Sequence, residues 1–213
     1  MVRHAVMQMQ RQTYPVDHVI YINAAFPAGQ AQPNANYEQL IRDAGAMFPE
    51  RVAVLKGPTL THHQNYMAAI NAVDVNRYDI FLQVDDDDLY LANYVQGVVD
   101  SYRTDKWDYS GTASNGLLRG TVWIEDMMLA GVGFEPEDIA LGVPEIIPPS
   151  LALSRRAVLA LKEMPDSGVY HDVQWRRYIA RLGMARKVRT DRNFIYYVHG
   201  KNVSTGHWLD NDP

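Results

Sequence analysis

Residues 85–88 are four consecutive aspartates, and they follow residues 79–84, a strand-length run rich in Ile, Phe, Leu and Val. Adjacent carboxylates repel one another, because like charges disfavour the ionised form. A bound cation relieves this repulsion, and Mg²⁺ and Mn²⁺ accept carboxylate oxygens while keeping positions open for substrate phosphates. The alternative is a charged helix N-terminus, where acids complement the macrodipole and cap the first turn. The stretch alone leaves both interpretations open.

The order of the predicted elements favours a binding site. Residues 16–22, 52–55 and 79–84 have the composition of buried strands, and segments with helical apolar spacing precede, separate and follow them. This alternation predicts an α/β fold with a mostly parallel sheet and helices on both faces. Such sheets bind ligands outside the carboxyl ends of their strands. Because residues 85–88 lie at such an end, we expect them to bind a ligand.

The second half of the chain has a mixed pattern. A helix near its end carries apolar residues from Trp175 to Leu182 at helical spacing, with Asp172 near its start and Gly183 as its stop. Residues 126–149 match no regular element. The other predicted elements are strands at residues 107–112, 117–124, 150–154, 187–189 and 194–198 and a helix at residues 155–164.

Composition limits the classes of protein and partner. The chain has 213 residues, of which 47% are hydrophobic and 21% charged, as expected of one globular domain. Its net charge of −5 provides no general basic field, so we expect no nucleic-acid partner. The absence of cysteine excludes disulfides and thiolate metal sites. No apolar run has the length of a transmembrane segment and residues 1–10 lack a signal-peptide core, so we expect a cytoplasmic protein.

Several short motifs in this order resemble glycosyltransferase family 2, the nucleotide-sugar-dependent enzymes of GT-A fold. The resemblance extends from residue 10 to about residue 204. Its carriers are Arg11-Gln12-Thr13-Tyr14-Pro15 before a strand, Gly57 with Gln64-Asn65-Tyr66, the four aspartates, residues 150–156 entering a helix, His171-Asp172, and His199-Gly200-Lys201-Asn202-Val203-Ser204.

The resemblance implies a single GT-A-like domain over residues 1–213. Residues 1–104 would form the nucleotide-sugar-binding half and residues 105–213 the acceptor half. In the first half, Asp85 would approach the ribose or base of a UDP- or GDP-sugar donor. Asn65 and Lys201 would contribute to binding the donor, and the acceptor would be a saccharide or another hydroxyl compound.

The resemblance also implies a metal and a catalytic base. Asp87 would ligate Mn²⁺ or Mg²⁺ bridging the donor diphosphate, with Asp88 and His199 completing the metal or diphosphate contacts. Asp172 would deprotonate the acceptor hydroxyl during in-line attack. The family usually has an acid where this chain has His171. For Asp172 the alternative is a helix cap.

One element of the family pattern is missing from the sequence. Family members begin with a strand and a base-contacting loop before the helix that opens this chain, and that strand lies beside the one carrying the acids. We expect either a longer reading frame upstream, a sheet that closes differently, or another segment in that position.

These observations lead to one expected function and two alternatives. We expect a metal-dependent inverting glycosyltransferase. The first alternative is a catalytically silent GT-A-like module that binds a glycan or a protein partner. The second is a metal-dependent phosphohydrolase that uses the acid cluster.

Overall fold

The structure is a computed structural model. It describes residues 2–16, 18–22, 52–56, 62–85, 88–112, 117–119, 122–124, 136–143, 146, 148–165 and 171–198. Residues 37–47, where the segment of helical spacing between the predicted strands 16–22 and 52–55 is expected, lie outside these ranges.

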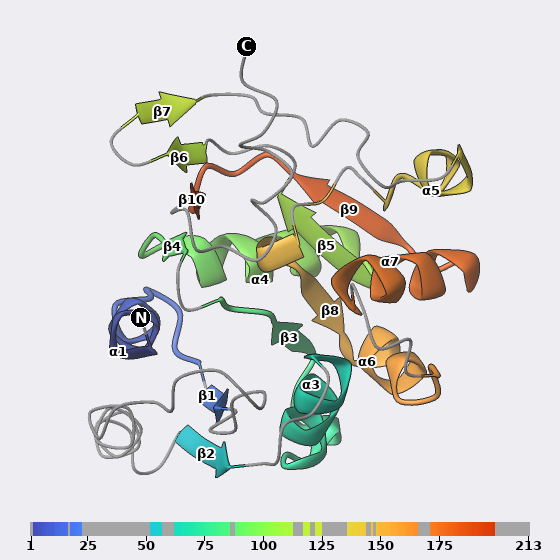
Figure 1. Ribbon diagram of the computed structural model, residues 1–213, viewed down its shortest axis with the longest axis horizontal. Helices are drawn as coiled ribbons and strands as arrows, with labels where there is room; N and C mark the ends of the chain where they lie inside the picture. The colour runs from blue at the N-terminus through green and yellow to red at the C-terminus, as the bar shows by residue number, and fades with distance from the viewer. Residues whose placement is uncertain are drawn as a thin grey trace, which may run out of the picture.

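The described chain is a mixed α/β protein (Figure 1). Its strands are β1 (His18–Ile22), β2 (Val52–Lys56), β3 (Ile80–Leu82), β4 (Leu89–Tyr90), β5 (Tyr109–Thr112), β6 (Leu117–Arg119), β7 (Val122–Ile124), β8 (Ala152–Ser154), β9 (Arg186–Arg189) and β10 (Phe194–Val198). Its helices are α1 (Val2–Gln10), α3 (His62–Asn71), α4 (Tyr94–Asp105), α5 (Pro136–Ala140), α6 (Arg155–Leu161) and α7 (His171–Arg181), with 3₁₀ turns η1 (Val75–Arg77) and η3 (Pro148–Ser150).

The described strands form three sheets, of orders β1-β2, β4-β10-β6-β7 and β3-β8-β5-β9. The prediction of a mostly parallel sheet is wrong for them. Pairs β1/β2, β5/β9 and β6/β10 are parallel, whereas β3/β8, β5/β8, β4/β10 and β6/β7 are antiparallel. The reason in the β3-β8-β5-β9 sheet is that β8 starts beside the ends of β3 and β5 and therefore runs against both.

Strand directions in the β3-β8-β5-β9 sheet define its two ends. β3 and β5 both run antiparallel to β8, and β9 runs parallel to β5. β3, β5 and β9 therefore finish on the same side, which we call the carboxyl end of the sheet, and they start at the opposite amino end. Asp85 follows β3 at the carboxyl end, in agreement with the sequence-based prediction.

Two hydrophobic clusters cover the faces of this sheet. Alternation along β8 separates them, because Ala152 packs with α4 in one cluster and Leu153 packs with α3, α6 and α7 in the other. The α4 cluster includes the fully buried residues Tyr94, Val98 and Phe194. Helices thus cover both faces, which supports the α/β prediction in its coarse form.

Among the described strands, β3 pairs with β8 alone and β1 pairs with β2 alone. No described strand joins β1 to β3. The expectation about the missing first strand therefore stays a prediction, with its alternatives open.

Helix α7 shows how far the predicted apolar stripe extends. Trp175 is 1% exposed and Ile179 is fully buried, as the helical spacing predicted. Leu182 is 49% exposed instead of buried, because α7 ends at Arg181 and Gly183 follows with φ +66°. The terminal residue of the stripe thus lies beyond the helix.

In the part of the chain that the structure describes, no helix has both the length and the apolar character needed to cross a membrane.

Gly111 in β5 provides a test of the packing at the carboxyl end. A Cβ atom there would lie 2.2 Å from Ile146 Cγ2 and 3.0 Å from Ser150 Oγ. Gly111→Ala is therefore expected to lower the free energy of unfolding by about 1–3 kcal/mol through overpacking, measured by urea denaturation. In an Ile146→Ala background the same change should cost less, because the clashing methyl group is gone. Equal losses in both backgrounds would contradict the proposed clash.

Candidate functional site

Asp85 is the described carboxylate that stands at the carboxyl end of β3, and it is half-buried. Its Oδ1 accepts hydrogen bonds from the Tyr66 hydroxyl and the Gln83 side-chain amide, both at 3.4 Å. Both donors are neutral, so these contacts orient the carboxylate without cancelling its charge. The strand and helix α3 therefore present an acidic group at the end of the sheet where ligands bind in open α/β folds.

The backbone at Asp85 is held by Tyr90 of β4. The Asp85 N–H donates to the Tyr90 Oη at 2.9 Å, and the Tyr90 hydroxyl donates to the Pro149 carbonyl at 3.0 Å. The Tyr94 hydroxyl makes a similar hydrogen bond to the residue after Pro149, donating to the Ser150 carbonyl at 3.2 Å. Tyr90 thus connects Asp85 to η3, and Tyr94 connects helix α4 to η3.

Burial and charge act together on these tyrosines. Burial, followed by the negative charges of Asp85 and Asp88, raises the pKa of Tyr90 well above its ordinary value. Burial also raises the pKa of Tyr94, although nearby Arg189 opposes that rise. The charges of Asp85 and Asp88 thus act on Tyr90 in the same direction as its burial.

Helix α1 and the turn after it hydrogen-bond the chain segment that follows the acids. The Gln8 side chain donates to the Asp88 carbonyl at 2.9 Å and accepts from the Tyr90 N–H. The Gln12 side chain donates to the Leu91 carbonyl at 2.9 Å and accepts from the Val95 N–H at 2.9 Å. These glutamines satisfy backbone groups of β4 and of the first turn of α4, and so position the acidic segment.

A chain of aromatic contacts connects Asp85 to helix α7. Tyr66, which donates to Asp85, lies edge-on to Trp175 with ring centroids 5.3 Å apart. The Trp175 indole N–H donates to His63 Nδ1 at 2.8 Å. His63 is only 6% exposed, because α3 turns it into the α3–α7 interface to accept this bond.

The structure describes the backbone of two predicted site residues in this neighbourhood. Asp172 is the second residue of α7, one turn before Trp175. Asn65 lies on α3 immediately before Tyr66. Their side chains are outside the described part of the chain, so the roles expected for them stay predictions.

The remaining predicted site residues divide into one that is described and three that are not. The Asp88 side chain is fully buried, so a cation bound by it would have to be enclosed by protein. Asp87, His199 and Lys201 lie outside the described residues. Within the described ranges, no three His, Asp or Glu side chains are grouped to hold a metal ion.

The donor chemistry of the described acids is nevertheless compatible with a hard divalent cation. Asp85 supplies carboxylate oxygens, and its half-buried side chain lies at the carboxyl end of the sheet. Mg²⁺ and Mn²⁺ accept such oxygen ligands, often from only one or two carboxylates. Asp85 therefore has the chemistry of a ligand for the expected metal, and the metal itself stays a prediction.

Sequence reasoning did not assign site roles to several residues at the carboxyl end. Tyr66, Tyr90 and Tyr94 resemble ordinary core aromatics in the sequence. Arg189 ends β9 and is 3% exposed, with its guanidinium 2.8 Å from Asp191 Oδ2 and 5.2 Å from the Tyr94 ring centroid. The sequence signal for Arg189 is a basic residue at the end of a predicted strand, and in the structure it pairs in register with Thr112.

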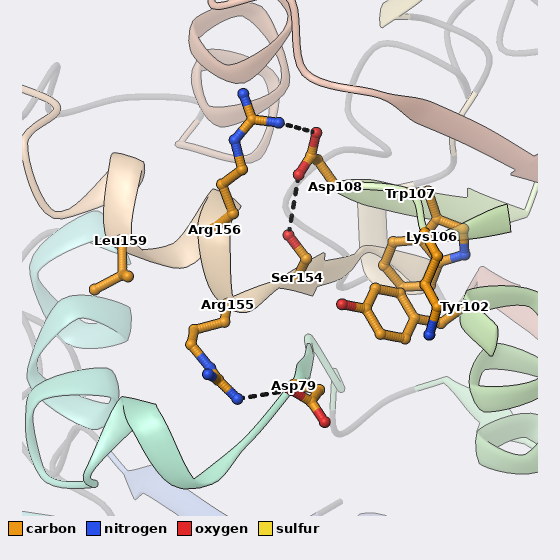
Figure 2. A pocket seen from close by; sticks show the side chains of 9 residues that line it. All are labelled: Asp79, Tyr102, Lys106, Trp107, Asp108, Ser154, Arg155, Arg156 and Leu159. Atoms are coloured by element: carbon orange, nitrogen blue, oxygen red, sulfur yellow. Dashed lines mark hydrogen bonds and ion pairs between the residues drawn. The ribbon is translucent and has the colours of Figure 1, made fainter.

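A pocket of about 430 Å³ lies at the opposite, amino end of the same sheet (Figure 2). Its lining includes Asp79 before β3, Asp108 before β5 and Ser154 at the end of β8. Strands of three or four residues separate the two ends by roughly 10 Å or more. The pocket is therefore distinct from the candidate site at Asp85.

Comparison with known proteins does not identify the chain: no model of a known protein family matches it, and no curated protein matches it.

The tyrosine contact at Asp85 is testable by removing one oxygen atom. Tyr90→Phe leaves the Asp85 N–H and the Pro149 carbonyl without that partner, and we expect a loss of about 1–3 kcal/mol in the free energy of unfolding, measured by urea denaturation. Tyr102→Phe is the matched control, because Tyr102 is half-buried and its hydroxyl bonds no described residue. Equal stability of the two variants would contradict the role of the Tyr90 bridge.

The raised tyrosine pKa values predict how stability depends on pH. In the unfolded chain both tyrosines ionise near pH 10, whereas in the folded protein Tyr90 and Tyr94 stay protonated to higher pH. The folded state then binds more protons, so stability is fully present below about pH 10 and falls above it, by up to about 1.4 kcal/mol per pH unit for each tyrosine. Urea denaturation from pH 8 to 11 should show a shallower fall for Tyr90→Phe than for Tyr102→Phe. Parallel curves would refute this assignment.

Proposed function

We propose that this chain is a metal-dependent inverting glycosyltransferase of GT-A type, which moves a sugar from a UDP- or GDP-sugar donor to a hydroxyl acceptor. The observation that carries the proposal is the position of Asp85, whose half-buried carboxylate follows β3 at the carboxyl end of the sheet. Ligands bind there in open α/β sheets. The motifs that resemble glycosyltransferase family 2 supply the choice of activity.

Donor binding is assigned to the first half of the chain, residues 1–104. In this proposal Asp85 contacts the nucleoside, and Asp87, Asp88 and His199 hold Mn²⁺ or Mg²⁺. A cation held by these residues would supply positive charge for the leaving diphosphate. Asn65 and Lys201 add hydrogen-bond donors for the same ligand. The Tyr66 and Gln83 bonds to Asp85 support this arrangement, because they keep the carboxylate in one orientation.

Acceptor activation is assigned to the second half, residues 105–213. Asp172 takes the proton of the acceptor hydroxyl as that oxygen attacks the anomeric carbon, and the carbon–oxygen bond to the diphosphate breaks on the opposite side. The contacts among Asp85, Tyr66 and Trp175 support this assignment, because they place the helix that carries Asp172 beside the acidic segment. Transfer with inversion needs donor and base on facing sides of one site.

A catalytically silent module that binds a glycan is the second candidate. The observation that favours it is that β3, which precedes the acids, has β8 as its one strand partner among the described residues. A site at the end of such a strand is held by fewer backbone hydrogen bonds than a site inside a wider sheet. Release of nucleoside diphosphate from a donor sugar separates the candidates, since a silent module binds without turnover.

Metal-dependent nucleotide binding tests the proposal. Isothermal titration of UDP and GDP in the presence of Mn²⁺ should show binding by the wild type to one of them. Binding should weaken by roughly 100-fold or more in Asp87→Ala, because the cation would lose a carboxylate ligand. Omitting Mn²⁺ should have a similar effect.

Asp100→Ala is the matched control for that experiment. Asp100 lies on α4 with its side chain 59% exposed, so its removal should leave binding unchanged. Binding of neither nucleotide by a folded protein in the presence of Mn²⁺, or equal binding by the wild type and Asp87→Ala, would reject the proposal.

A further inference from the structure

The pocket at the amino end of the β3-β8-β5-β9 sheet is not used by the proposed transferase. Figure 2 shows two ion pairs on either side of Ser154, with Leu159 and Tyr102 at opposite sides of the pocket. Its volume of about 430 Å³ is that of a site for a small molecule, for which roughly 300–1,000 Å³ is usual.

The charges lining this pocket have a positive excess. Arg155 pairs with Asp79 at 2.6 Å and Arg156 pairs with Asp108 at 2.9 Å, so each carboxylate is neutralised by one arginine. Lys106 is a third cation and forms no ion pair with a described residue; its ammonium lies 5.0 Å from the Tyr102 ring centroid. The pocket thus carries a net positive charge, although the whole chain has a net charge of −5.

The two carboxylates of the lining differ, because the Asp79 side chain is 73% exposed beside Arg155, whereas the Asp108 oxygens are already engaged. The Asp108 side chain is only 10% exposed, and its oxygens already accept from Arg156, the Ser154 hydroxyl and the Ala185 N–H. In contrast, the Arg156 side chain is 66% exposed and uses one nitrogen, Nη1, in that contact. Exposed Lys106 adds an ammonium group with three donors. A ligand that offers several acceptor oxygens and negative charge matches this arrangement.

Local backbone geometry holds Lys106 at the pocket. Lys106 ends α4 in the left-handed conformation with φ 49°, and its N–H donates to the Tyr102 carbonyl at 2.9 Å. The Tyr102 ring is in turn held edge-on against buried Trp107, with centroids 5.0 Å apart. The cation and the aromatic wall are therefore parts of one helix end. Leu159, which is 46% exposed on α6, supplies an apolar surface on the other side.

We propose that this pocket is a second ligand site, which binds a small organic phosphate. The lining supplies Lys106, Arg155 and Arg156 as cations that attract its oxyanion (Figure 2), and the organic part of the ligand lies between Tyr102 and Leu159. The site is independent of the acids at the carboxyl end, and it needs no divalent cation.

Phenyl phosphate, titrated calorimetrically into the full chain at low salt without divalent cations, tests the proposal. The wild type should bind it, and the double variant Lys106→Asn/Arg156→Gln should bind it roughly tenfold or more weakly, because two charge-assisted contacts are lost. Asparagine at position 106 tolerates the left-handed backbone. Lys162→Gln, which removes an exposed cation just after α6 and outside the pocket lining, should bind like the wild type. Inorganic phosphate should bind more weakly than phenyl phosphate, because it cannot use the apolar walls.

Amide chemical shifts of the wild type give a readout that does not depend on the folding of variants. Addition of phenyl phosphate should shift Lys106, Ser154 and Arg156 and leave Asp85 unchanged. Asp85→Asn should retain this binding. The second site is therefore tested separately from the proposed transferase function. No binding by the wild type, equal binding by the double variant, or shifts centred on Asp85 would overturn the proposal.

Discussion

The hydroxyl group of Tyr90 is the contact on which the carboxyl end of the sheet depends. It accepts from the Asp85 N–H and donates to the Pro149 carbonyl, and burial keeps it protonated. One oxygen atom thus ties the acidic segment after β3 to η3, which leads into β8. Because β8 pairs with both β3 and β5, the same contact relates the acids to the rest of the sheet.

The fold was predictable where local pattern determines structure. Apolar runs located β1, β2, β3 and β10 to within two residues, because a buried strand needs such composition wherever it pairs. Pairing itself was not predictable: the position of β8 between β3 and β5 depends on contacts distant in sequence. The short strand β4 was missed for the same reason. Its backbone is satisfied by Gln8 and β10, and a helix was expected directly after the acids.

The candidate site was predictable only in its charged part. Four aspartates after an apolar strand indicated Asp85, because repulsion among them needs an explanation. The residues that orient it gave no comparable signal, since Tyr66 and Tyr90 have the spacing of ordinary core aromatics. His63 is buried because it accepts the hydrogen bond of the Trp175 indole N–H. Sequence shows which groups carry charge, but the neutral side chains that hold them are found only from packing.

The central claim is that a divalent cation and a nucleotide bind at Asp85, beside Tyr66 and Trp175. Paramagnetic broadening by Mn²⁺ in the presence of UDP or GDP tests it directly, with Mg²⁺ as the diamagnetic reference. Trp175 lies one aromatic contact from the Asp85 partner Tyr66, whereas Trp107 precedes β5 at the amino end. The account predicts strong broadening of the Trp175 indole N–H signal and a much weaker effect on Trp107. Equal broadening of both signals, or broadening of Trp107 alone, would contradict it.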